Sequence, residues 1–106
     1  MITSGHFIDA VGGFLLGAGS WIAGRGSQFW THGADASDRH VSIGARCYIG
    51  SAVRFAPGAS IADQSVVAIG SVVTKKFTDR RVLVAGVPAS VVREDYESPL
   101  AGREDS

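Results

Sequence analysis

The sequence predicts an all-β fold, a parallel β-helix in which short strands wind into stacked triangular coils. Three observations lead to this prediction. Apolar residues recur every six positions, small residues dominate the fifth position of each six-residue unit, and the repeat stops once, between Gln28 and His40. At 106 residues and 11.0 kDa, the chain has the size of one domain.

The repeat is clearest in the second half of the chain, where the units are IGARCY, IGSAVR, FAPGAS, IADQSV, VAIGSV and VTKKFT. Neither an α-helix nor a long amphipathic strand has a period of six. Six residues suit a short strand followed by a turn, and three such units close one coil. The first residue of each unit then points into a shared interior, as predicted for Ile43, Ile49, Phe55, Ile61, Val67 and Val73.

The fifth position forms a second inward row, which is Cys47, Val53, Ala59, Ser65, Ser71 and Phe77. Nearer the N-terminus, LGAGSW and IAGRGS continue the first row through Leu16 and Ile22 to a polar Gln28. Nine such units predict about three coils. Glycines at the second position of a unit (Gly17, Gly44, Gly50) predict corners that need a permissive backbone. A small β-sandwich is the alternative, but its strands would alternate with period two over longer runs.

Composition excludes several classes of function. The net charge is zero, which does not favour binding to nucleic acid or to an anionic membrane. The N-terminus lacks a basic start and an unbroken apolar run, so we expect no signal peptide and no membrane insertion. Cys47 is the single cysteine, which excludes an internal disulfide and favours a reducing, cytoplasmic location. We expect Cys47 to be a buried packing residue and not a nucleophile.

The segments IGARCYIGSAVRFAPGASIADQSVVAIGSVVTK and VAGVPASVVRE closely resemble the hexapeptide-repeat acyltransferases, in particular small O-acetyltransferases. The resemblance covers roughly residues 14–93. It implies a left-handed β-helix, closed by a short C-terminal helix and assembled as a homotrimer. We therefore expect a β-helix domain over residues 1–93 with an extruded loop at about 30–41. Residues 94–106 form a polar tail, for which both helix and extended chain remain open.

The interruption QFWTHGADASDRH cannot keep the ladder in register, so a loop must leave the prism there. An imidazole titrates near neutral pH and suits removal of a proton from an attacking hydroxyl or amine. The resemblance implies that His32, in Thr31-His32-Gly33, is this general base. A histidine satisfied by a local hydrogen bond is the alternative.

Other loop residues are candidates for contacts with the acceptor. Asp35, Asp38 and Arg39 can orient His32 or hold a polar acceptor such as a sugar, or they can simply solvate the loop. Trp30 can form a wall of the acceptor pocket or become buried at an interface. His40 matches no position of the family pattern, and we expect it to lie on the loop surface.

The resemblance also implies acetyl-CoA as the acyl donor, with its pantetheine arm held along the prism between two protomers. The residues that fall where relatives contact coenzyme A are Ser51, Ile69, Thr74, Lys75 and Arg93. Lys75 could meet a nucleotide phosphate. Two departures weaken the match. Ser90 stands where relatives often have a basic residue, and a helper asparagine of the sugar-modifying branch would fall before the start of the chain.

These features favour transfer of an acetyl group from acetyl-CoA to a hydroxyl of a sugar or similar small metabolite. A non-catalytic binding or scaffold module is the second possibility. A γ-carbonic-anhydrase-like metal hydratase is the third, but the closest histidines, His32 and His40, are eight residues apart and not five. We therefore expect no metal.

Overall fold

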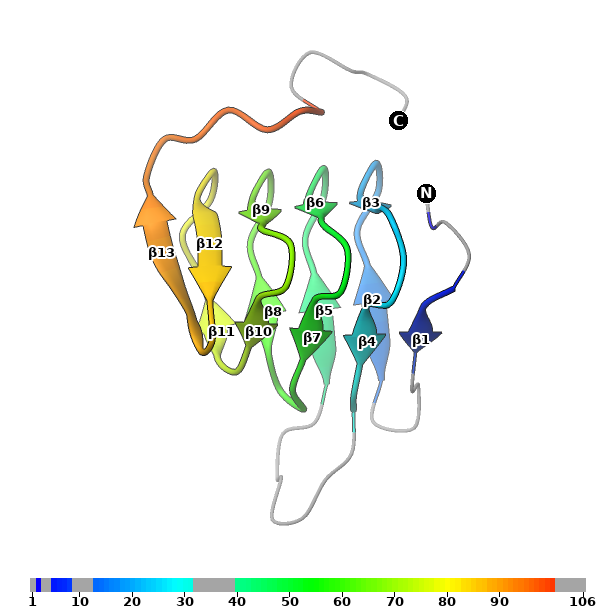
Figure 1. Ribbon diagram of the computed structural model, residues 1–106. Coiled ribbons are helices and arrows are strands. Elements are labelled where there is room, and N and C mark those ends of the chain that lie inside the picture. Colours follow the sequence, from blue (N-terminus) through cyan, green and yellow to red (C-terminus); the bar gives the residue numbers. More distant parts are fainter. Residues whose placement is uncertain (1, 3–4, 9–12, 32–39, 101–106) are drawn as a thin grey trace.

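The computed structural model describes residues 2, 5–8, 13–31 and 40–100, which form a left-handed parallel β-helix with three sheets. From β1 to β12, consecutive strands along the chain belong to different sheets, and each sheet runs along the stack of coils (Figure 1). This architecture is the one predicted from the six-residue repeat. The described residues contain no helix.

Each sheet is named here by its first strand. The β1 sheet contains β1 (Phe7–Ile8), β4 (Gln28–Phe29), β7 (Arg54–Phe55) and β10 (Val72–Val73). The β2 sheet contains β2 (Phe14–Leu16), β5 (Val41–Ile43), β8 (Ser60–Ile61) and β11 (Lys76–Phe77). The β3 sheet contains β3 (Trp21–Ile22), β6 (Tyr48–Ile49), β9 (Val66–Val67), β12 (Leu83–Gly86) and β13 (Ala89–Arg93).

The coils are therefore four in number and not the three predicted. Each sheet has four parallel strands, and β13 adds an antiparallel fifth to the β3 sheet. The count was too low because the six-residue pattern is weak around β1, Phe7–Ile8. This strand nevertheless pairs with β4 and belongs to a first coil.

The interior is formed by the two rows that the repeat predicts. First-position residues from Ile43 to Val73 and fifth-position residues from Cys47 to Phe77 are all buried. Both rows point inward because each unit places its turn at the same point of the coil. The described part of the tail, residues 94–100, forms bends and turns and runs back along the stack from β13 (Figure 1).

The inward row before the loop ends at Phe29 and not at Gln28 as predicted. Phe29 is fully buried and pairs in register with Phe55, whereas Gln28 is half-buried. The physical reason is one extra residue in the preceding turn: residues 23–27 connect β3 to β4, whereas residues 50–53 connect β6 to β7.

The glycine prediction was right about the residues and wrong about their role. Left-handed backbone occurs at the fourth position of a unit, at Arg46, Ala52, Gly58, Gln64 and Gly70. The second-position glycines are needed for close approach between coils. A Cβ on Gly44 would lie 2.7 Å from the backbone nitrogen of Asp63, which a real side chain cannot do.

Three corners join the sheets, and each is named here by its main feature. The loop corner, between the β1 and β2 sheets, contains connections 30–40, 56–59 and 74–75. The arginine corner, between the β2 and β3 sheets, contains connections 44–47, 62–65 and 78–82. The groove corner, between the β3 and β1 sheets, contains connections 23–27, 50–53 and 68–71.

Candidate functional site

The predicted loop leaves and re-enters the β-helix at the loop corner. Passing from Phe29 to Ile43 takes 14 residues, whereas the equivalent step in the next coil, from Phe55 to Ile61, takes six. The loop thus adds eight residues at one corner of one coil. His32, Asp35, Asp38 and Arg39 lie in residues 32–39, outside the described part of the chain, and their roles stay predictions.

Both ends of the loop are anchored on the β-helix. Thr31 is fully buried, and the ring of Trp30 packs on Phe7 with centroids 4.7 Å apart. The indole Nε1 of Trp30 donates a hydrogen bond to Oε1 of Gln28 at 3.1 Å, and 37% of the residue remains exposed. At the other end, the half-buried His40 lies against Gly13. Trp30 therefore combines a packed ring with a face still open to a ligand or a neighbouring chain.

Two of the predicted donor-binding residues, Ser51 and Ile69, lie together at the groove corner. They line a groove of about 590 Å³ over the β3 sheet, with walls that are mostly apolar. The backbone N–H of Gly70 donates to the carbonyl oxygen of Ser51 at 3.0 Å, which fixes the two turns next to each other. The Ser51 hydroxyl accepts a hydrogen bond from the backbone N–H of Arg25 at 3.2 Å. An apolar groove with a few polar groups suits an extended, weakly polar arm.

Arg93 lies beside this groove. It pairs with Leu83 across the β12–β13 hairpin, and Leu83 forms part of the groove wall. The chain beyond β13 adds Tyr96 and Pro99 to the same wall. These two residues were missed by sequence reasoning, because the segment after Arg93 is polar and carries no repeat that places it against the coils.

Thr74 and Lys75 lie at the loop corner and not in the groove. Both are exposed, and the Nζ of Lys75 lies 5.2 Å from the centroid of the Phe77 ring. They occupy the corner from which the loop departs, two coils further along the stack. Within one chain, the predicted donor-binding residues are thus divided between two corners.

Cys47 is buried, as predicted. Its Sγ–H donates to the carbonyl oxygen of Ala62 at 3.1 Å. Burial raises the pKa of this thiol to about 11, because the thiolate would lose its hydration. A neutral, enclosed thiol is a poor nucleophile.

Among the described residues, no group of three or more His, Cys, Asp or Glu side chains is arranged to hold a metal ion. The described chain also contains no helix that is long and apolar enough to cross a membrane.

Comparison with known proteins supports the resemblance seen in the repeats. No protein-family profile matches the chain. Over 54 residues, 51% of the chain, it is 46% identical to a galactoside O-acetyltransferase of Escherichia coli strain K12. That match spans 26% of the relative, so the chain corresponds to about a quarter of its length.

The fold also has a counterpart among solved structures. It is similar to the crystal structure of a maltose O-acetyltransferase from Clostridium difficile 630, with a TM-score of 0.57 and 21% identity. The similarity covers 92% of this chain and 66% of that protein. The two comparisons confirm the left-handed β-helix and the resemblance to hexapeptide-repeat O-acetyltransferases.

Proposed function

We propose that this chain, a hexapeptide-repeat β-helix protein similar to O-acetyltransferases, transfers an acetyl group from acetyl-CoA to a hydroxyl of a sugar or similar small metabolite. The observation that carries the proposal is the 46% identity to a galactoside O-acetyltransferase over 54 residues. The loop corner adds physical support, because a long loop on a rigid and otherwise regular scaffold is a common place for functional residues. The proposed location is the cytoplasm, because the single cysteine, Cys47, favours a reducing compartment.

In this proposal His32 is the general base. Its imidazole takes the proton of the acceptor hydroxyl while the hydroxyl oxygen attacks the thioester carbonyl. Backbone N–H groups stabilise the oxyanion of the tetrahedral intermediate. The intermediate collapses with cleavage of the carbon–sulfur bond, and the departing sulfur takes the proton from the imidazolium. The products are an acetyl ester and free coenzyme A. Trp30, Asp35, Asp38 and Arg39 hold the acceptor near His32.

The donor lies between two chains of a homotrimer. Ser51 and Ile69 of one protomer line its groove and Arg93 lies beside it, while Thr74 and Lys75 of a neighbour meet its phosphates. Exposed apolar side chains support an assembly, since Ile69 is 74% exposed and Val87 is 72% exposed. Burying these side chains against a second copy removes apolar surface from water. The closed cyclic symmetry of a trimer limits the assembly to three chains.

The test is release of free thiol from acetyl-CoA in the presence of galactosides, maltose and glucose. We expect sugar-dependent release by the intact protein. His32→Ala should lower kcat/KM by about 100-fold or more, the usual contribution of a general base. His40→Ala, at the other end of the same loop, is the matched control and should retain activity.

Three outcomes would contradict parts of this proposal. Acetyl-CoA binding without thiol release for any acceptor would favour a binding or scaffold module. Full activity of His32→Ala would exclude His32 as the base. Stoichiometric zinc or iron in the purified protein would favour a metal hydratase.

A further inference from the structure

The arginine corner repeats one side-chain position over three successive coils. Arg46, Gln64 and Arg81 each adopt left-handed backbone, with φ of 56°, 61° and 55°. Their backbone N–H groups donate to the preceding coil, to the carbonyl oxygens of Ala18 at 2.9 Å, Ala45 at 2.8 Å and Asp63 at 3.1 Å. Equal φ and equivalent hydrogen bonds make the three side chains leave the corner in a row, about 4.8 Å apart from coil to coil.

Arg80 adds a third guanidinium to this row. Its Nη2 donates a hydrogen bond to Oε1 of Gln64 at 2.9 Å. Gln64 thus holds the guanidinium of Arg80 at this corner. Within the described chain, the guanidinium of Arg81 has no hydrogen bond or ion pair. Arg80 and Arg81 are neighbours in the chain and bring two positive charges to the same wall of the pocket, where a bound anion would reduce their mutual repulsion.

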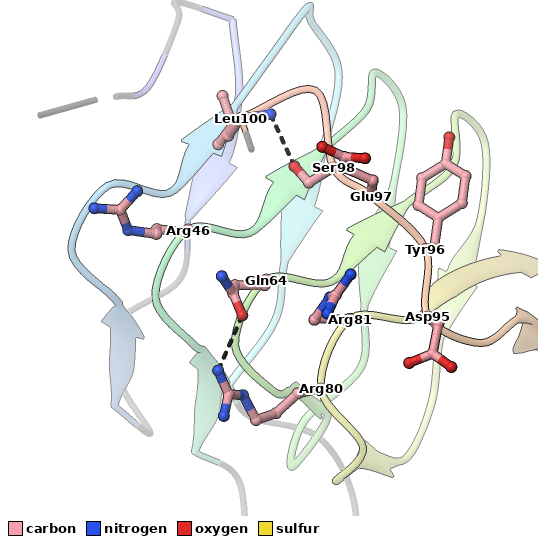
Figure 2. A pocket seen from close by; sticks show the side chains of 9 residues that line it. All are labelled: Arg46, Gln64, Arg80, Arg81, Asp95, Tyr96, Glu97, Ser98 and Leu100. Atoms are coloured by element: carbon pink, nitrogen blue, oxygen red, sulfur yellow. Dashed lines mark hydrogen bonds between the residues drawn. The ribbon is translucent and has the colours of Figure 1, made fainter. Parts of the chain in front are cut away.

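The C-terminal segment faces this row across a pocket of about 570 Å³ (Figure 2). The backbone N–H of Tyr96 donates to the carbonyl oxygen of Arg81 at 2.8 Å and holds the segment in place. Further along, the buried Ser98 and Leu100 pack on the coils, and the Ser98 hydroxyl accepts a hydrogen bond from the Leu100 N–H at 3.0 Å. The segment contributes Asp95, Tyr96 and Glu97 to the lining of the pocket.

Positively and negatively charged side chains line opposite sides of the pocket. Guanidinium groups come from the corner, whereas carboxylates come from the C-terminal segment. Arginines bind phosphate oxygens with paired, charge-assisted hydrogen bonds. Carboxylates only accept hydrogen bonds, so they suit hydroxyl groups and repel a second anion. The pocket therefore matches a molecule with one anionic end and a hydroxylated body.

We propose that this pocket binds a small phosphorylated sugar, with its phosphate on Arg80 and Arg81 and its hydroxyls toward Asp95 and Glu97. The site does not rest on the proposed acetyl transfer. It lies at a different corner from the loop and shares only Tyr96 with the donor groove.

Isothermal titration calorimetry of the intact protein tests the site. The probes are glucose 6-phosphate, galactose 1-phosphate and ribose 5-phosphate, compared with glucose and with inorganic phosphate. At least one sugar phosphate should bind about tenfold or more tightly than either of its parts, since only the whole molecule satisfies both sides of the pocket.

Arg81→Gln is the diagnostic variant, because Gln64 shows that glutamine fits the same left-handed corner. It should weaken sugar phosphate binding about tenfold, as expected for loss of a charge-assisted contact. Arg54→Gln, which removes an exposed arginine on β7 of the β1 sheet, is the matched control and should leave binding unchanged. Unfolding temperatures of both variants check that the fold is intact.

The proposal is overturned if none of the three sugar phosphates binds, or if Arg81→Gln binds as tightly as the unsubstituted protein. It is also overturned if inorganic phosphate binds as tightly as the sugar phosphates. Competition with acetyl-CoA tests whether the pocket binds the phosphate of a sugar phosphate or a phosphate of acetyl-CoA. If Arg81→Gln weakens acetyl-CoA binding and acetyl-CoA displaces the sugar phosphate, the corner belongs to the donor site and no separate site exists.

Discussion

The ring of Phe29 stacks on the ring of Phe55, with centroids 5.1 Å apart. The rings of Phe29 and Phe14 form a T-shaped pair, with centroids 5.2 Å apart. Phe29 and Phe55 are fully buried, and Phe29 is the last residue of β4 before the loop. The stack therefore fixes the point from which Trp30 and Thr31 start the loop.

Phe29→Ala should destabilise the protein by about 3–5 kcal/mol, the usual cost of removing a buried phenylalanine ring. The free energy of unfolding, measured by urea denaturation at constant protein concentration, checks this. Trp30→Ala is the control, since its ring is partly exposed and packs only at the surface. Its cost should be about 1 kcal/mol. Equal losses for the two variants would show that Phe29 does not carry the packing at the base of the loop.

The two kinds of glycine in the coils should differ in tolerance to alanine. Gly70→Ala adds a methyl group where no atom lies within 4 Å, so the cost is that of left-handed backbone alone, about 1–2 kcal/mol. Gly44→Ala forces two coils apart at Asp63, and we expect a cost of about 3 kcal/mol or more. Thermal unfolding of both variants distinguishes the effects. A larger loss for Gly70→Ala would mean that left-handed backbone at the corners, and not close approach between the coils, sets the larger demand for glycine.

The buried thiol of Cys47 should make stability depend on alkaline pH. Burial raises its pKa from 9.0 to about 11. Below pH 9 the thiol is protonated in both states and has no effect. Between pH 9 and about pH 11 the unfolded chain loses its proton while the folded chain keeps it, so the free energy of unfolding falls as pH rises. The fall attributable to Cys47 is about 2–3 kcal/mol.

Urea denaturation of the parent protein and of Cys47→Ala, at pH 8 and near pH 11, isolates this contribution. The variant starts less stable because it leaves a small cavity, but its stability should decrease less over the same interval. If both proteins lose the same free energy between the two pH values, Cys47 does not titrate as its burial requires.

The fold could be predicted from the sequence because each unit of six encodes one strand and one turn. Burial of Ile49 and Val53 follows directly from their places in the unit. The backbone conformation of the corners could not be predicted this way. Arg46 and Gln64 adopt left-handed backbone that glycine usually supplies, because the ladder between coils stabilises it.

The candidate site was only partly predictable for a similar reason. The loop was predicted because it stops the repeat, and Ser51 and Ile69 were proposed through the resemblance. The pocket at the arginine corner was missed, since Arg46 and Arg81 are far apart along the chain. The available signal was the coil period: Gln64 and Arg81 follow Arg46 at one and two coil lengths, after 18 and then 17 residues. Tyr96 had no such signal, because its segment is held by tertiary contacts alone.

Lys75→Ala should raise the KM for acetyl-CoA by about three- to tenfold and leave kcat nearly unchanged, if Lys75 meets a phosphate of the donor. Lys75 is exposed at the loop corner, so its attraction for a phosphate is screened and the effect should shrink as salt is added. Lys76→Ala is the matched control, since the Nζ of Lys76 donates to the carbonyl oxygen of Gly58 at 2.9 Å. Initial rates at varied acetyl-CoA and two ionic strengths give both constants. Equal KM changes for the two variants would indicate a general loss of positive charge and exclude a specific contact from Lys75.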